Sequence, residues 1–321
     1  MTPPILRATR LCKTFRIPLK SEGWRDIFSP KHESFDAVKN LDLSIRPGEK
    51  VAFLGPNGAG KSTAIKMFCG ILAPSGGQLE VCGLDPLGDR GELTYLIGAV
   101  FGQVSKLYYH LTPIDTYKLL GKMYDVPNEQ LRKRLDYLFE SFQMRDLLHI
   151  PVRKLSLGQR MRAELVASLI HSPKILFLDE PTIGLDMIAK ANLRDVINTI
   201  NRTENTTILL TSHDIGDIEE ICDRVVIINH GSVVFDGSLH DLKTEHVKEK
   251  YVSLRFDAAT AFKPKPDMTI LDSDPFRVTF SIPNRKEILK ETLAHVIETY
   301  EIEDISVTEP DTESIIKGFY Q

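Results

Sequence analysis

The stretch Gly55-Pro56-Asn57-Gly58-Ala59-Gly60-Lys61-Ser62-Thr63 fits the phosphate-binding pattern G-x-x-x-x-G-K-[ST]. The apolar run 51–54 before it is typical of a buried strand, and residues 63–68 after it predict the start of a helix. A strand, a glycine loop and a helix in this order direct backbone N–H groups and the positive end of a helix dipole at one point. The sequence therefore predicts an anion site in an α/β domain.

The residue types in this loop suit a nucleoside triphosphate. Glycine at 55, 58 and 60 lets the backbone adopt unusual conformations and approach phosphates closely. Lys61 places a cation against the β and γ phosphates, and the Ser62 hydroxyl suits Mg²⁺. A glycine-rich turn with an incidental lysine would give the same pattern, so the assignment depends on the rest of the chain.

The bulk composition limits the class of protein. The 321 residues are enough for about two domains, and the net charge of −4 lacks the basic excess of a nucleic-acid-binding protein. No stretch approaches the ~20 apolar residues of a transmembrane helix, and the first residues lack the apolar core of a signal peptide. Four scattered cysteines without a C-x-x-C pair predict reduced thiols in the cytosol.

The first 54 residues predict strands around an insertion. Residues 5–11 and 38–45 are expected to form half-buried antiparallel strands. Between them, segment 17–35 carries Trp24, Ile27 and Phe28 at roughly helical spacing. This segment is either a hydrophobic anchor or an amphipathic element that lies against a membrane or a membrane partner.

The middle of the chain predicts a helical insertion over about 104–172. Leucines at 131, 135 and 138 and Phe142 recur at spacings of three and four. Near its end, Ser156 is suited to cap a helix that runs to about residue 170. That cap would create a second helix N-terminus able to face an anion.

Polar residues follow two apolar strands in the second half of this domain. Residues 175–178 end in Asp179-Glu180, and residues 207–210 are followed by Thr211-Ser212-His213. Acidic side chains at a buried strand end are costly unless they meet a metal, water or a cation; a solvated strand end is the alternative. Chemistry in open α/β sheets gathers beyond the carboxyl ends of the strands, which favours a shared site.

The remaining residues predict a separate small domain. After a first domain of residues 1–240, residues 241–250 are expected to form a charged connecting helix. Residues 251–321 then predict a β-β-α-β order and a small α+β domain. It has no catalytic constellation, so binding, regulation and dimerisation remain open for it.

The motifs along the chain are GPNGAGKST at 55–63, Gln103, LSLGQ at 155–159, ILFLDEPT at 175–182, GLD at 184–186 and TSHD at 211–214. Together they resemble those of the ATP-binding subunit of an ABC transporter, over about residues 5–240. The resemblance implies a P-loop ABC ATPase with a RecA-like core sheet, an antiparallel β subdomain and a helical insertion. The C-terminal extension resembles that of daunorubicin-type drug exporters, and segment 17–35 more weakly resembles that of polysaccharide exporters.

The resemblance also implies roles for single residues in ATP hydrolysis. The whole loop Gly55–Thr63 would bind the nucleotide, and Ser62, Gln103 and Asp179 would serve Mg²⁺. Glu180 would be the general base, and His213 would contact the γ phosphate. Phe15 stands where the family places an aromatic ring on adenine, although an ordinary core phenylalanine is the alternative.

In this family the signature of one cassette covers the nucleotide of the other, which implies a homodimer. Ser156, Gly158 and Gln159 would act on the partner's ATP, and Asp186 would lie at the interface. Leu157 departs from the usual LSGGQ signature, where glycine stands. Because Ser156 and Gly158 are intact, we expect a working site and leave the effect of Leu157 on the rate open.

The expected partners are separate transmembrane permease subunits, which would hold this chain at the cytoplasmic face of the membrane. Tyr108, Tyr109 and Leu111 would transmit the motion to the permease, or the tyrosines would be core residues. The alternatives are a soluble ABC ATPase that acts on ribosomes or nucleic acid, and a regulatory module without turnover. A single cassette, an acidic net charge and the presence of Glu180 and His213 favour the transporter. The C-terminal resemblance favours export, and the substrate is not predicted.

Overall fold

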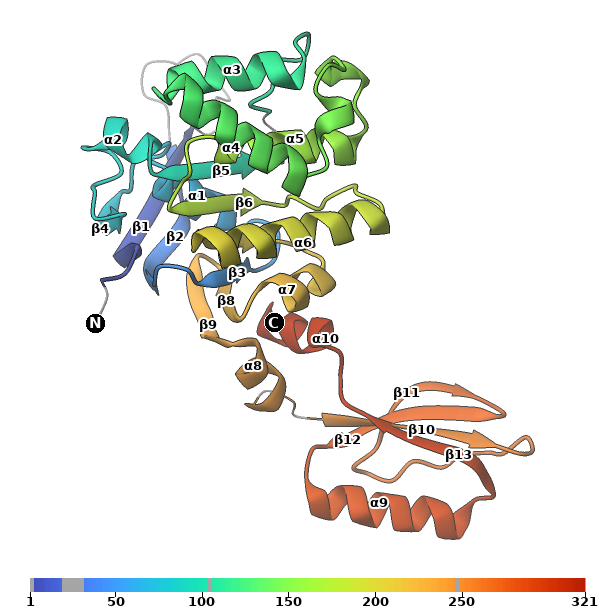
Figure 1. Ribbon diagram of the computed structural model, residues 1–321. Coiled ribbons are helices and arrows are strands. Elements are labelled where there is room, and N and C mark those ends of the chain that lie inside the picture. The colour runs from blue at the N-terminus through green and yellow to red at the C-terminus, as the bar shows by residue number, and fades with distance from the viewer. Residues whose placement is uncertain (1–2, 19–31, 103–104, 246, 248, 321) are drawn as a thin grey trace, which may run out of the picture. The chain divides into compact units, whose positions relative to one another are not determined.

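The structure is a computed structural model that describes residues 3–18, 32–102, 105–245, 247 and 249–320 (Figure 1). The chain forms two compact units, Met1–Gly237 and Ser238–Gln321. Among the described residues, no helix has the length and apolar character that crossing a bilayer requires. All four cysteines are free thiols, as predicted.

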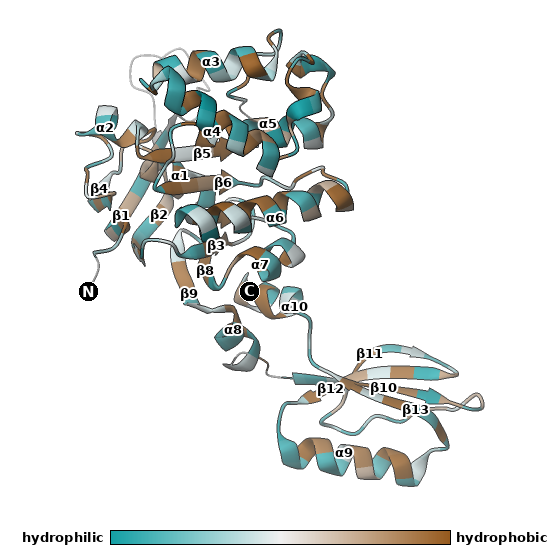
Figure 2. Cartoon of the chain, viewed as in Figure 1, coloured by the Kyte–Doolittle hydropathy of each residue, from teal (hydrophilic) through white to brown (hydrophobic). Residues whose placement is uncertain are grey.

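A six-stranded sheet forms the centre of the first unit. Its first five strands run parallel, so their carboxyl ends meet at one edge. The hydrophobic runs lie inside it: β6 is brown along most of its length in Figure 2. The strand order is β5 (Ile97–Phe101), β6 (Ile175–Asp179), β7 (Thr207–Thr211), β3 (Lys50–Leu54), β8 (Arg224–Asn229) and β9 (Ser232–Ser238).

A second, antiparallel sheet consists of β2 (His32–Ile45), β1 (Leu6–Pro18) and β4 (Gly76–Val81). Helix α1 (Lys61–Phe68) contributes to the core that joins the two sheets, where the Phe68 ring lies 6.3 Å from the rings of both Phe53 and Phe177. Strands β1 and β2 remain paired well beyond the predicted ranges, so Phe35 belongs to a strand. Residues 19–31 of the predicted insertion, with Trp24, Ile27 and Phe28 among them, lie outside the described residues, whereas its two ends belong to β1 and β2.

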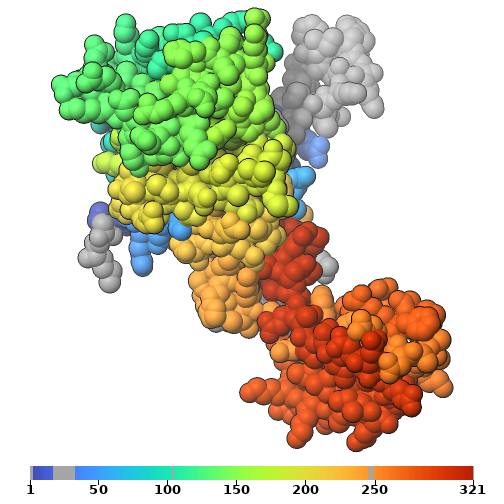
Figure 3. Space-filling model, turned by 45° about the vertical axis from the view of Figure 1, so that its right-hand side comes forward, coloured from blue at the N-terminus to red at the C-terminus, as the bar shows by residue number. Residues whose placement is uncertain are grey.

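The predicted helical insertion is confirmed and forms one lobe, green in the space-filling view (Figure 3). Arg134 ties it to the core, because its guanidinium donates to both carboxylate oxygens of Glu204 and to the Leu169 carbonyl. Besides α1, the helices of the first unit among the described residues are α2 (Arg90–Thr94), α3 (Pro113–Met123), α4 (Asn128–Ser141), α5 (Leu157–Leu169), α6 (Met187–Glu204) and α7 (Ile215–Ile221), with short 3₁₀ turns at Arg145–Leu147 and Val152–Lys154.

The second unit is a four-stranded antiparallel sheet, order β11-β12-β10-β13, with helix α9 packed against it. The predicted β-β-α-β order missed a strand, because every residue of β11 is exposed and its sequence shows no apolar alternation. The expected connecting helix is shorter than 241–250, since the next strand begins at Glu249. The elements are α8 (Leu239–Glu245), β10 (Glu249–Phe256), β11 (Thr269–Asp274), β12 (Arg277–Pro283), α9 (Lys286–Thr299), β13 (Ile302–Thr308), α10 (Thr312–Lys317) and a 3₁₀ turn at Gly318–Tyr320.

Candidate active site

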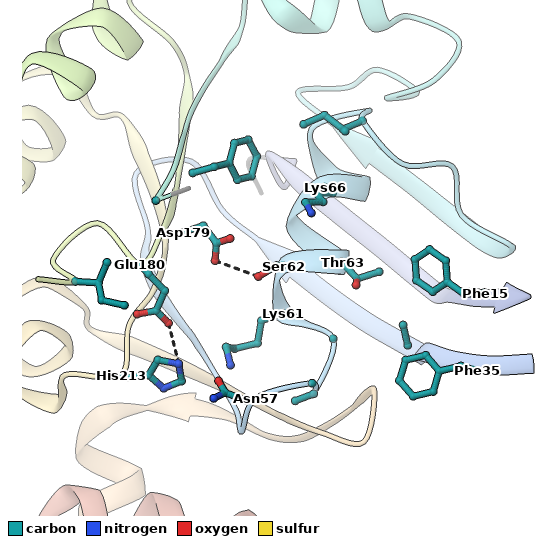
Figure 4. Close-up of a pocket in the computed structure, with 18 residues that line it drawn as sticks. Phe15, Phe35, Asn57, Lys61, Ser62, Thr63, Lys66, Asp179, Glu180 and His213 are labelled. Carbon is teal, nitrogen blue, oxygen red and sulfur yellow. Dashed lines mark hydrogen bonds and ion pairs between the residues drawn. The ribbon is translucent and has the colours of Figure 1, made fainter. Parts of the chain in front are cut away.

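An open pocket of about 710 Å³ lies at the carboxyl edge of the six-stranded sheet (Figure 4). Its wall combines the phosphate loop, the ends of β6 and β7, and two aromatic side chains from the antiparallel sheet. The lining residues include Phe15, Phe35, Asn57, Gly58, Ala59, Gly60, Lys61, Ser62, Thr63, Asp179, Glu180 and His213.

The phosphate loop places its lysine inside this pocket. Lys61 Nζ donates to the carbonyl oxygens of Gly55 at 2.6 Å and Pro56 at 3.1 Å. Burial lowers the pKa of Lys61, and the nearby carboxylates of Glu180 and Asp179 oppose this shift. The two carbonyl oxygens are neutral, so they balance the charge of the Lys61 ammonium only in part. The oxygens of a phosphate group are anionic and could therefore take their place.

Oxygen donors that suit Mg²⁺ lie beside this lysine. Ser62 Oγ lies 3.3 Å from Asp179 Oδ1, which also accepts a hydrogen bond from Thr211 Oγ1 at 2.8 Å. The described residues contain no group of three or more His, Cys, Asp or Glu that could hold a metal alone. Magnesium bound to a nucleotide needs no such group, since phosphates and water complete its shell. Gln103 lies outside the described residues, but the Gly102 N–H just before it donates to the Asp179 carbonyl.

Glu180 and His213 face one another on one side of the pocket. His213 Nε2 lies 3.2 Å from Glu180 Oε1, as Figure 4 shows. Burial raises the pKa of Glu180, against the opposing influence of His213 and Lys61. The Glu180 backbone has φ of 56°, a left-handed conformation that is strained for glutamate, and its N–H donates to Thr211 Oγ1. The end of β7 thus holds the backbone from which this carboxylate projects.

The signature residues are not part of this pocket. Ser156 is the N-cap of the 13-residue helix α5, as predicted. Its hydroxyl accepts from the Gln159 N–H, and Gln159 Oε1 accepts from the Ser156 N–H, which is a complete capping box. Ser156 is exposed, and neither it nor Gly158 or Gln159 is among the described residues that line the pocket.

A cluster of exposed apolar side chains surrounds this helix start. We call Leu157, Met187 and Ile188 the signature patch; they are 45%, 86% and 75% exposed. Ile183, which is 60% exposed, lines the pocket instead. A Cβ on Gly184 would lie 2.8 Å from Leu157 Cδ2, so the signature meets the loop before α6. Asp186 in that loop is exposed and caps α6 by accepting from the Ala189 N–H.

Several pocket residues were not predicted from the sequence, among them the aromatic Phe35. Phe35 pairs with Phe15 in the register of β1 and β2, and both line the pocket. Phe15 is half-buried, and Lys13 Nζ lies 5.2 Å from its ring centroid. An aromatic residue shortly before the predicted strand 38–45 was the available signal, but pairing with Phe15 depends on strand register. Stacking of Phe15 on adenine stays a prediction.

Comparison with known proteins identifies the family. The family model for ABC transporters matches residues 38–183. The ABC transporter ATP-binding protein NatA of Bacillus subtilis (strain 168) is 35% identical over 215 residues, which cover 67% of this chain and 87% of NatA. The chain belongs to the ATP-binding subunits of ABC transporters. It is therefore an ABC transporter ATPase, and the predicted family, fold class and enzyme class are confirmed.

Other relatives of this ABC ATPase extend the comparison. The daunorubicin resistance ATP-binding protein DrrA3 of Streptomyces coeruleorubidus is 32% identical and spans 87% of this chain and 89% of its own length. The structure of CbiO1 from Clostridium perfringens, part of the ABC transporter complex CbiONQ, superimposes with a TM-score of 0.61 at 28% identity, over 74% of this chain and 89% of CbiO1. A dimeric ATP-binding cassette in a post-hydrolysis state, bound to ADP and Pi, has the same TM-score at 26% identity, over 73% of this chain and 98% of the cassette.

The loop glycines of this ABC ATPase provide a matched test of the backbone geometry. Gly58 and Gly60 have φ of +82° and +103°, so alanine at either position costs roughly 1–2 kcal/mol. Only a Cβ at 60 would also collide, at 2.2 Å from the Ala37 carbonyl oxygen. Gly60→Ala should therefore lower the nucleotide-free unfolding free energy by at least about 1 kcal/mol more than Gly58→Ala. Equal losses in denaturant titrations would contradict this geometry.

Proposed function

We propose that this chain is the ATP-hydrolysing subunit of an exporter and that ATP-driven pairing of two copies moves substrate through separate permease subunits. The observation that carries the proposal is that the motifs of the family fall on two separate surfaces of this chain. The phosphate loop, Asp179, Glu180 and His213 line one pocket, whereas the signature residues lie outside it, with Ser156 exposed. A chain arranged in this way needs a second signature to complete its site.

Nucleotide binding would use the loop and the aromatic pair. The backbone N–H groups at the start of α1 and the Lys61 ammonium would bind the β and γ phosphates. Phe15 and Phe35 stand on neighbouring strands in the same pocket, where adenine could stack on Phe15. The Lys61 ammonium now donates to the carbonyl oxygens of Gly55 and Pro56, and it would exchange these partners for phosphate oxygens when ATP binds.

Ser62 and Asp179, with Gln103, would hold Mg²⁺ in this proposal, since hydroxyl, amide and carboxylate oxygens are suitable ligands. When bound, the ion would neutralise charge on the β and γ phosphate oxygens. Thr211 keeps the Asp179 carboxylate oriented toward Ser62 through its own hydrogen bond.

In hydrolysis Glu180 would act as the general base. Its carboxylate would accept a proton from water as the water oxygen bonds to the γ phosphorus and the bond to the β-phosphate oxygen breaks. His213, 3.2 Å from this carboxylate, would contact the γ phosphate and hold the base in line. Lys61 would stabilise the charge that develops on the phosphate oxygens.

A second copy would supply the missing part of the site. The N-terminus of α5 carries the positive end of a helix dipole, and its N-cap Ser156 is exposed to an incoming nucleotide. The signature patch and Asp186 surround this helix start and would be covered by pairing. The relative solved with ADP and Pi is a dimeric cassette, which supports this arrangement.

Removal of the base should trap the pair. Glu180→Gln should keep ATP binding and lower the turnover by roughly 10²–10⁴, because the amide cannot take the proton. With ATP added, the variant should then accumulate as a dimer, which size-exclusion chromatography with light scattering would detect. Glu303→Gln, at an exposed ion pair in the second unit, is the control and should hydrolyse ATP normally and stay unpaired. Normal turnover of Glu180→Gln would show that the base has been misassigned.

The raised pKa of Glu180 predicts an acid limit to activity. The base works only when ionised, and its pKa is raised above the ordinary 4.5 by burial. The turnover number should therefore fall on acidification with a midpoint above 4.5, while nucleotide binding, measured in parallel, persists. The residual turnover of Glu180→Gln should not show this fall on acidification. A midpoint below 4.5 in the unaltered chain would contradict the proposed environment.

The helical lobe offers a surface for the permease. Tyr108, Tyr109 and Leu111 are 47%, 58% and 39% exposed, so they are not core residues. Backbone hydrogen bonds join this loop to the 3₁₀ turn before the signature, from Val152 N–H to the Leu111 carbonyl and from Arg153 N–H to the Tyr109 carbonyl. Motion of the signature would reach the permease through these bonds. DrrA3 and a Nod factor export ATP-binding protein among the relatives support export.

Cell fractionation would separate this proposal from a soluble ABC ATPase that acts on ribosomes or nucleic acid. Co-expressed with the membrane proteins encoded beside it, the chain should sediment with membranes at their cytoplasmic face and elute with a polytopic partner. Tyr109→Glu should release it, because a buried charge opposes docking. Leu87→Glu, at a side chain that is 45% exposed, should leave it bound. Recovery with ribosomes or DNA would support the alternative.

A further inference from the structure

The loop that carries His213 is held in place on both sides of the histidine. The His213 side chain is itself 53% exposed and faces Glu180. Its neighbour Ser212 is 5% exposed, and the Asp214 N–H donates to Ser212 Oγ at 3.0 Å. The backbone on each side of the imidazole is therefore fixed by groups that lie deeper in the fold.

A buried ion pair holds the Ser212 side. Ser212 Oγ donates to Asp217 Oδ2 at 3.2 Å, and Arg194 Nε donates to Asp217 Oδ1 at 2.6 Å. The Asp217 side chain is fully buried, and that of Arg194 is 15% exposed. A buried carboxylate with a charged donor on one oxygen and a hydroxyl on the other has little freedom to move. Arg194 also reaches Glu220, which is 60% exposed.

A second ion pair holds the Asp214 side. The Lys190 ammonium donates to Asp214 Oδ2, and this hydrogen bond lowers the pKa of Asp214. Asp214 Oδ1 accepts from the Gly216 N–H and caps α7. Lys190 and Arg194 are four residues apart on α6, so they project from one face of a single helix.

The same helix begins at the proposed contact with the second copy. Asp186 caps α6 four residues before Lys190, and Met187 of the signature patch is its first residue. Positions 186, 190 and 194 therefore follow one helical face from the patch to the loop of His213. A shift of α6 caused by pairing would be transmitted to this loop through both ion pairs.

We propose that Arg194 and Lys190, through Asp217, Ser212 and Asp214, are positioning residues that set the place of the His213 imidazole. They do not touch the nucleotide; they hold the turn so that Nε2 stays beside Glu180. This inference rests on the role proposed above for His213. It adds that α6 links pairing of the two copies to that histidine.

Ser212→Ala is the sharpest variant, because it removes the hydroxyl link and leaves Asp217 paired with Arg194. Misplacement of a catalytic group can cost up to about 10²-fold, and we expect the turnover number to fall roughly 10-fold. The KM for ATP should stay within error of the unaltered chain. The melting temperature should fall by a few degrees, because Asp217 Oδ2 and the Asp214 N–H each lose a buried partner, so the rates are compared well below it. Ser212→Thr keeps the hydroxyl and should restore the rate. Glu220→Gln, at the exposed partner of Arg194, should leave it unchanged.

A spectroscopic measurement separates positioning from a general loss of structure. In the full chain with ¹³C-labelled histidine, the His213 signal is assigned by its loss in His213→Ala. It should shift in Ser212→Ala and return in Ser212→Thr, while the other histidine signals stay in place. An unshifted signal, or equal rates for Ser212→Ala and the unaltered chain, would overturn the inference.

The two proposals fail in different ways. Normal turnover of His213→Ala would refute the proposed role of the histidine itself. An inactive His213→Ala together with a fully active Ser212→Ala would refute only the positioning role of the network. A loss of rate that Ser212→Thr does not restore would also count against it, because the hydroxyl would then not be the link.

Discussion

The parallel pairing of β5, β6, β7 and β3 is the constraint on which the rest of this structure depends. Parallel strands end at the same edge, so residues that are far apart in the chain become neighbours there. The phosphate loop follows β3, Asp179 ends β6, and His213 lies two residues beyond the end of β7. Backbone pairing alone therefore assembles a site with a cation, two carboxylates and an imidazole, and the side chains only refine its geometry.

That refinement is concentrated at the ends of β6 and β7. Thr211 holds both the Asp179 carboxylate and the Glu180 N–H, so one hydroxyl fixes the proposed ligand and the proposed base. The Glu180 backbone is left-handed, which is a strained conformation for glutamate and persists only where neighbouring groups enforce it. The two carboxylates can be partly buried because each lies beside a polar side chain: the Thr211 hydroxyl donates to Asp179, and the His213 imidazole lies beside Glu180.

The pocket and the signature patch each lack what the other surface offers. The pocket carries its own lysine but no helix N-terminus other than that of α1, among the described residues that line it. The exposed start of α5 has the positive end of a helix dipole and a capping serine, but it lies outside the pocket that holds the phosphate loop. Apolar side chains as exposed as Met187 and Ile188 gain from being covered. Pairing of two copies would satisfy both surfaces at once, which is why we regard it as the unit of function.

The sequence by itself determined what depends on neighbours along the chain. The loop 55–63, the polar ends after 178 and 210, the Ser156 cap and the helical repeat around Leu131–Phe142 are local signals, and each lies where it was predicted. Tertiary structure decided what depends on register and packing: Phe35 beside Phe15, Nε2 of His213 beside Glu180, and Arg194 against Asp217. Strand β11 was missed because its exposed residues carry no apolar period. Local periodicity reflects burial of one face, whereas contacts between distant segments follow from how the whole chain packs, and no short stretch encodes that.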